Sequence, residues 1–158
     1  EETGKDFEEN AILKAKNAFT KTNISSVGDD SGLIVPAIND EPGLYSARYA
    51  GLNATDSDNR NKLISKLKDK KLESTYAYFF CCIVAVGIKD QNEVIVCDGK
   101  VEGEVRTIER GEKGFGYDPM FYPKGYSESF AELSSLEKNR ISHRGQALRK
   151  LMDKLNKA

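Results

Sequence analysis

The feature that most restricts the fold is a run of apolar and aromatic residues between positions 75 and 88. The run is rich in Tyr, Phe, Val and Ile, which are favoured in β-strands. It is too continuous for a strand with one face in water, where apolar and polar residues alternate. The sequence therefore predicts a central strand that is covered on both faces by other elements.

Helices are predicted from apolar residues that recur at helical spacing. Over residues 6–22, Phe7, Ala11 and Ala15 fall on one face of such a helix. A second helix is predicted over residues 58–70, with Thr55 or Asp56 as its N-cap. Two more are expected near the C-terminus, starting after Ser134 and after Ser142. These helices are the elements expected to cover the strand.

Turns are predicted where polar residues and glycines interrupt the strands. The stretch 29–32 is expected to be a polar turn between short strands over 24–28 and 33–38. Asp98-Gly99 is predicted to be the two-residue turn of a β-hairpin, because both of its positions favour positive φ. Residues 109–126 are dense in glycine and proline, which predicts a shaped loop with a short strand near Met120.

Composition indicates a single soluble domain over residues 1–158, with 39% hydrophobic and 31% charged residues. The net charge is −1, so the chain lacks the strongly basic balance that is typical of nucleic-acid binding. No apolar run approaches the roughly 18 residues that span a bilayer. The three cysteines are odd in number and lack CxxC spacing, which predicts reduced core residues and a cytoplasmic location.

Asp29 and Asp30 are candidate ligands for a hard cation such as Mg²⁺, which prefers carboxylate oxygens. Side chains alternate along a strand, so both acids reach one ion only if the chain turns at Ser31. An Asx-turn without a metal is the alternative. Glu2 and Lys14 are further candidate site residues. Without a functional role, Glu2 would be an acid that compensates a helix dipole, and Lys14 would be a surface lysine.

Phe115 lies between Gly114 and Gly116, which leaves its ring free to stack on a flat ligand while the backbone approaches closely. A tight turn is the alternative interpretation. His143 and Arg144 begin the last helix, where free N–H groups suit an acceptor-rich base or an anion. A solvated helix cap would explain this pair equally well.

Four motifs in register resemble the Ham1-like inosine triphosphate pyrophosphatases, and the resemblance spans the whole chain. They are Asp29-Asp-Ser-Gly-Leu33, Pro42-Gly-Leu-Tyr-Ser-Ala-Arg-Tyr-Ala-Gly51, Gly114-Phe-Gly-Tyr-Asp-Pro119 and Ser142-His-Arg-Gly145, supported by Glu1-Glu-Thr-Gly4 and Glu9-Asn-Ala-Ile-Leu-Lys14. The resemblance implies an α/β fold with a long mixed twisted β-sheet flanked by helices, and two lobes with a central nucleotide cleft. Family members begin with a strand and a phosphate-binding Ser/Thr-x-Asn-x-x-Lys element, so the resemblance implies that both precede Glu1.

The function implied by the resemblance is hydrolysis of the non-standard purine nucleoside triphosphates ITP, dITP and XTP to a monophosphate and pyrophosphate. It further implies Mg²⁺ as cofactor, a homodimer, and no nucleic-acid or membrane partner. By the same match, Asp30 is the proton acceptor and a metal ligand, Glu2 and Asp29 are further metal ligands, and Lys14 is a catalytic phosphate contact. The implied substrate-binding residues are Ser31, Phe115, Gly116, Tyr117, Asp118, Lys138, His143 and Arg144.

Two other functions stay open at this point. Without the phosphate-binding element, the chain could be a nucleotide-binding module that does not turn its ligand over. A Maf-type pyrophosphatase, which acts on pyrimidine or modified nucleotides, is the other alternative, and the Ser142-His-Arg-Gly145 match argues against it.

Overall fold

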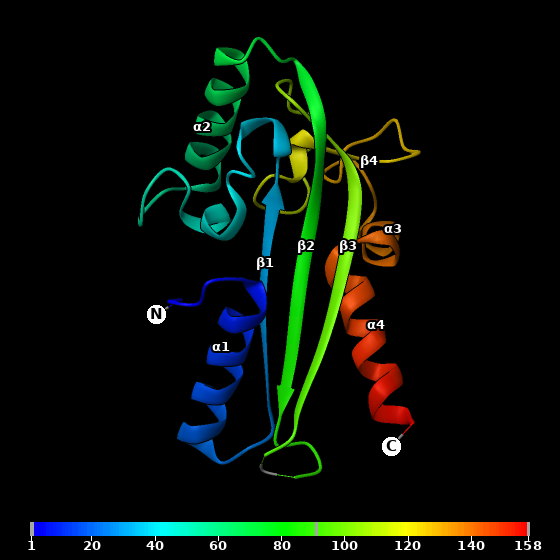
Figure 1. Ribbon diagram of the computed structural model, residues 1–158. Coiled ribbons are helices and arrows are strands. Elements are labelled where there is room, and N and C mark those ends of the chain that lie inside the picture. The colour runs from blue at the N-terminus through cyan, green and yellow to red at the C-terminus, as the bar shows by residue number, and fades with distance from the viewer. Residues whose placement is uncertain (1, 91, 158) are drawn as a thin grey trace. The chain divides into compact units, whose positions relative to one another are not determined.

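The structure is a computed structural model that describes residues 2–90 and 92–157, so Glu1 of the first motif lies outside the described residues. Its helices and strands are α1 (Phe7–Thr22), β1 (Ser26–Ile34), α2 (Asp56–Asp69), β2 (Ser74–Val86), β3 (Val94–Arg106), β4 (Phe121–Pro123), α3 (Ser135–Ile141) and α4 (His143–Asn156). The strands form one sheet in the order β1-β2-β3-β4 (Figure 1). The expected α/β class is confirmed, with an antiparallel sheet in the described part of the chain where a mixed one was expected.

The chain divides into two compact units. The first contains residues 2–31, 80–100 and 142–157, and the second contains residues 32–79 and 101–141. Each of the strands β1, β2 and β3 continues from one unit into the other. The single domain expected over residues 1–158 stays a prediction.

β2 is the central strand that the sequence predicts. In the first unit, Cys81, Ile83 and Ala85 pack with Ala147 and Leu151 of α4. The alternate residues of the strand, Cys82, Val84 and Val86, pack with Ala11 and Ala15 of α1. All three cysteines are buried and free of disulfides, as expected. Because side chains alternate along a strand, α1 and α4 cover its two faces.

In the second unit the core is aromatic. Phe79 of β2 lies 4.7 Å from Phe121 of β4 and 5.9 Å from Phe130, measured between ring centroids. Leu63 and Leu67 of α2 belong to the same buried cluster. This packing anchors α2 and also β4, the short strand within the glycine-rich loop at residues 109–126.

The predicted helix starts are confirmed by their caps. Asp6 accepts a hydrogen bond from the backbone N–H of Glu9 and caps α1. Thr55 and Asp58 form a reciprocal capping box at the start of α2, and Ser142 caps α4. None of the helices in the described part of the chain is both long and apolar enough to span a membrane.

The turn predicted at residues 29–32 is wrong. β1 runs unbroken through Asp29, Asp30 and Ser31, and the chain leaves the strand only before a 3₁₀ helix at Pro36–Ile38. The two acids have partners on α1 and α4, so polar residues in this strand need no exposed turn. The polarity of the segment therefore reflects side-chain contacts and not a break in the strand.

The hairpin turn predicted at Asp98-Gly99 is also wrong, because both residues lie inside β3. The turn after β2 begins instead at Gly87, which has a φ of +69° and donates to the carbonyl of Glu93. Gly99 does not have positive φ. A Cβ at Gly99 would lie 2.0 Å from the backbone oxygen of His143, so glycine is needed there for the close approach of α4.

Gly99→Ala is expected to lower the free energy of unfolding by about 1 to 3 kcal/mol, because the added methyl group collides with the backbone of α4. Denaturant unfolding followed by circular dichroism measures the loss. Asp98→Ala is the control, since it removes only an exposed ion pair with Lys150. Equal losses in the two variants would contradict the assigned role of Gly99.

Candidate active site

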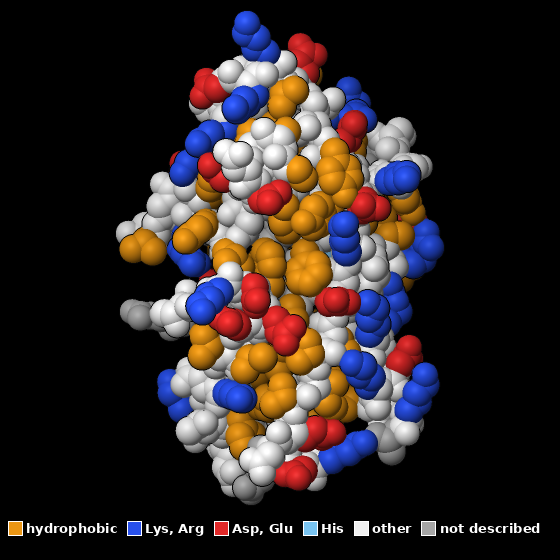
Figure 2. Space-filling view, viewed as in Figure 1, with side chains coloured by type: hydrophobic (Ala, Val, Ile, Leu, Met, Phe, Trp, Pro, Cys, Tyr) orange, Lys and Arg blue, Asp and Glu red, His pale blue; other side chains and the backbone are white. Residues whose placement is uncertain are grey.

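An acidic cluster in the first unit is organised by Lys14 of α1. Its ammonium lies 2.6 Å from the carboxylate of Glu2 and 3.0 Å from Oδ1 of Asp30, and it donates to the backbone oxygen of Asp29 at 2.9 Å. Asn10, one turn earlier on α1, donates to Oδ2 of Asp30 at 3.1 Å. Both oxygens of Asp30 are therefore held by one helix. Figure 2 shows acidic side chains gathered around the N-terminal end of this helix.

Burial acts in opposite directions on the pKa values of Asp30 and Lys14, because it disfavours the charged form of each side chain. Asp30 is only 7% exposed, and burial raises the pKa of its carboxyl above the ordinary value, although Lys14 and Asn10 act against this rise. For Lys14, burial acts to lower the pKa, but the carboxylates of Glu2 and Asp30 outweigh it and the pKa is raised. Lys14 is therefore cationic at neutral pH, and Asp30 is a stronger base than an exposed aspartate.

Asp29 faces a different partner. The guanidinium of Arg144, at the start of α4, lies 2.9 Å from Oδ2 of Asp29. Neighbouring side chains of a strand point to opposite faces, which separates Asp29 from Asp30. Within residues 2–90 and 92–157, no three His, Cys, Asp or Glu side chains gather closely enough to hold a metal ion. Glu2 and Asp30 share Lys14, whereas Asp29 pairs with Arg144, and the metal-binding roles expected of these three acids stay predictions.

Ser31 and His143 lie beside these groups in the chain. Ser31 follows Asp30 on β1 and is partly buried. His143 is buried, begins α4 and precedes Arg144. Their predicted contacts with substrate stay predictions.

A second cluster, in the second unit, surrounds Phe115. Asp118 accepts hydrogen bonds from the backbone N–H of Phe115 at 3.0 Å and from the ammonium of Lys138 at 2.5 Å. That ammonium lies 4.6 Å from the centroid of the Phe115 ring, within the range of a cation–π interaction. Phe115 is 59% exposed, whereas Asp118 and Tyr117 are buried. The structure thus brings these predicted residues together around one accessible aromatic ring.

Two residues that the sequence analysis missed contact this cluster from α2. Asp56 accepts a hydrogen bond from the backbone N–H of Gly116, and Arg60 donates to its carbonyl oxygen. An Asp and an Arg four residues apart on a helix are usually interpreted as a pair within the helix. No signal in the sequence links them to a loop more than 50 residues later.

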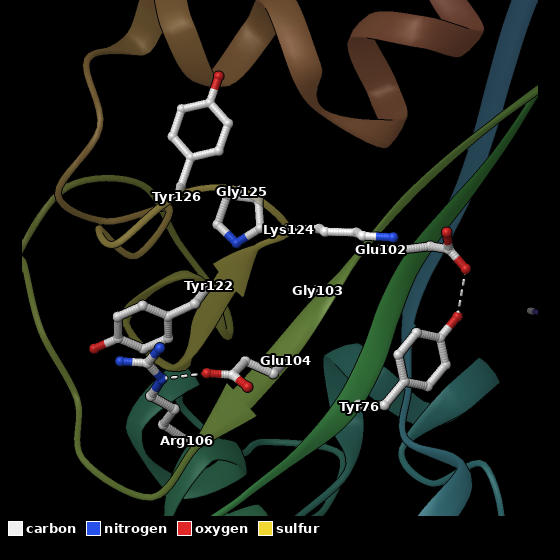
Figure 3. Close-up of a pocket in the computed structure, with 10 residues that line it drawn as sticks. Tyr76, Glu102, Gly103, Glu104, Arg106, Tyr122, Lys124, Gly125 and Tyr126 are labelled. Atoms are coloured by element: carbon white, nitrogen blue, oxygen red, sulfur yellow. Dashed lines mark hydrogen bonds and ion pairs between the residues drawn. The ribbon is translucent and has the colours of Figure 1, made fainter.

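A pocket of about 450 Å³ elsewhere in the second unit contains none of the predicted residues (Figure 3). Arg106 lies 3.9 Å from the centroid of the Tyr122 ring, and its Nε donates to Glu104 at 2.6 Å. Tyr76 donates to Glu102, and both residues line the same pocket. Arg106 and Glu104 are thus paired with each other, and Glu102 is bonded to Tyr76.

Comparison with known proteins agrees with the resemblance seen in the motifs. The Ham1 family profile matches residues 1–154. The dITP/XTP pyrophosphatase of Idiomarina loihiensis is 48% identical over 157 residues, which are 99% of this chain and 78% of that protein. The dITP/XTP pyrophosphatase of Bacillus anthracis is 47% identical over 155 residues, covering 98% of this chain and 77% of that protein.

Solved structures show the same likeness. The Staphylococcus aureus Ham1 protein superposes with a TM-score of 0.89 at 46% identity, covering 99% of this chain and 79% of that chain. A HAM1 protein from Coxiella burnetii superposes with a TM-score of 0.92 at 44% identity, covering 100% of this chain and 80% of that chain.

Proposed function

Because the chain belongs to the Ham1 family, we propose that it hydrolyses the non-standard purine nucleoside triphosphates ITP, dITP and XTP to a nucleoside monophosphate and pyrophosphate. The observation that carries this proposal is the buried Asp30 carboxylate, held by Asn10 and by a lysine that it shares with Glu2. The similarity to dITP/XTP pyrophosphatases over nearly the whole chain supports the choice of substrate.

The first unit supplies the chemistry at the phosphates. A triphosphate carries close to four negative charges, which repel a nucleophile approaching phosphorus, and the Lys14 ammonium offsets part of this repulsion. Asp30 accepts the proton of the attacking water, a task suited to a carboxylate whose pKa is raised by burial. The attack breaks the bond between the α- and β-phosphates, and pyrophosphate leaves.

Mg²⁺ is the cofactor that the donor set fits. Glu2 and Asp30 both reach the Lys14 ammonium, and Mg²⁺ is commonly held by one or two carboxylates together with substrate phosphate oxygens. Glu2 and Asp30 would hold the ion. When bound, it supplies charge neutralisation and polarisation of the phosphoryl group.

The base is recognised by stacking and by hydrogen-bond polarity. Phe115 offers an exposed ring for stacking, with Lys138 held beside it by Asp118. Inosine and xanthine carry a 6-keto acceptor, whereas adenine carries a 6-amino donor, so N–H donors from Lys138, His143 or Arg144 stay unpaired against adenine. An unpaired buried donor costs about 1 to 3 kcal/mol, which is roughly 5- to 150-fold in preference.

The function is tested by pyrophosphate release from ITP, dITP, XTP, GTP and ATP in the presence of Mg²⁺. We expect ITP, dITP and XTP to be hydrolysed faster than ATP, and equal rates on ATP and ITP would contradict the proposal. IMP binding in calorimetry without pyrophosphate release would instead indicate a binding module. Preference for dTTP or UTP over ITP would favour a Maf-type activity.

The same family membership leads us to expect a homodimer in the cytoplasm, with no nucleic-acid or membrane partner. Light scattering after size-exclusion chromatography measures the oligomeric state.

A further inference from the structure

Two side chains of α2 hold both backbone groups of a single loop residue. Oδ2 of Asp56 lies 2.8 Å from the backbone nitrogen of Gly116, and Nη1 of Arg60 lies 2.9 Å from its carbonyl oxygen. Asp56 and Arg60 are four residues apart and so project from the same face of the helix. Gly116 is the neighbour of Phe115, whose ring is the proposed stacking surface for the base.

The part of the loop that carries Phe115 gains little support from burial, because Gly114 and Phe115 are exposed, whereas Tyr117 and Asp118 after them are buried. Gly114 and Gly116 have φ values of +75° and +60°, which glycine adopts without strain. Glycine also adopts many other conformations, so these two residues do not by themselves fix the backbone around Phe115. The ring between them is largely exposed and gains little from burial. From inside the loop, Asp118 holds the N–H of Phe115. From outside the loop, Asp56 and Arg60 of α2 hold the N–H and the carbonyl of Gly116.

The helix that provides these contacts is itself firmly anchored. Its first turn is closed by the capping box of Thr55 and Asp58, and Leu63 and Leu67 are fully buried in the aromatic core of the second unit. The guanidinium of Arg60 is also bonded to Glu109, which limits its orientations. Asp56 and Arg60 therefore connect a capped, well-packed helix to an exposed part of the loop.

We propose that Asp56 and Arg60 are positioning residues for the nucleotide base, which act by holding the Phe115 ring in its stacking orientation before the nucleotide binds. This inference rests on the proposed function of Phe115. Preorganisation of this kind improves binding because less freedom is lost when the ligand arrives. Neither residue takes part in the chemistry at phosphorus, so its removal affects substrate binding and not the chemical step.

The expected result for Asp56→Ala and for Arg60→Ala is an increase of about 5- to 30-fold in KM for ITP, with kcat changed less than about twofold. Asp56→Asn keeps an acceptor oxygen for the Gly116 N–H and is expected to retain a KM near that of the wild type. Asp69→Ala is the matched control, because it removes an exposed acid from the same helix at the end remote from the loop. A similar KM increase in Asp69→Ala would overturn the proposal.

A double-mutant cycle tests whether the effect passes through the ring. In the Phe115→Ala background we expect Asp56→Ala to cause no further increase in KM, because no ring is left to be positioned. Additive increases would overturn the proposal.

Amide hydrogen exchange separates this inference from the proposed function. If the wild type releases no pyrophosphate from ITP, the proposed function fails, yet exchange at Gly116 still reports whether α2 holds the loop. Faster exchange of the Gly116 amide is expected in Asp56→Ala and not in Asp56→Asn. Unchanged exchange in Asp56→Ala would overturn the inference whatever the activity.

Discussion

Asp30→Asn is expected to lower kcat for ITP hydrolysis by about 10²- to 10⁴-fold, the range that a positioned general base contributes. The substitution removes the proton acceptor and one negative charge without changing the volume of the side chain. Steady-state pyrophosphate release measures the loss. Retention of more than about a tenth of the wild-type rate would rule out Asp30 as the proton acceptor.

Folding should survive this substitution. The carboxylate of Asp30 is buried at a cost, which is why its pKa is raised, and an amide avoids that cost while still meeting Lys14 or Asn10. A melting temperature within a few degrees of the wild type is therefore expected. Asp29→Asn is the matched control, since Asp29 is paired with Arg144 on the other face of β1, and it should reduce turnover much less.

Lys14→Met is expected to reduce kcat/KM for ITP by about 10²- to 10³-fold, comparable to the loss of one preorganised donor at a developing negative charge. Methionine keeps most of the length of the side chain but removes the cation that both Glu2 and Asp30 contact. Without it, the two carboxylates repel each other and the triphosphate loses a positive partner.

Lys16→Met provides the control for this effect, because Lys16 lies on the same helix and is exposed. It should leave kcat/KM within about twofold of the wild type. A loss below about threefold in Lys14→Met would place the phosphate-binding charge elsewhere.

Elements that depend on short-range patterns could be predicted from the sequence. The α1 helix follows from apolar spacing, and the α2 helix follows from apolar spacing together with an N-cap at Thr55, a contact within one helical turn. β2 follows from a continuous run of residues with high β-propensity, which is typical of a strand covered on both faces. The motifs around Asp30 and Phe115 likewise pointed to the family, because they are contiguous in the chain.

Contacts between side chains from distant parts of the chain depend on how the elements pack, and the sequence does not reveal them. Asp29 and Asp30 are adjacent in sequence, yet one pairs with Arg144 and the other with Lys14, because a strand directs neighbouring side chains to opposite faces. The turns predicted around these two acids and at Gly99 are wrong for the same reason. Glycines and pairs of polar residues favour turns locally, but both also occur inside strands. A glycine is suited to a strand position where a helix packs closely, and an acid is suited to a position where a helix supplies a charged partner. That choice depends on residues far away in the chain, as does the contact of Asp56 with Gly116.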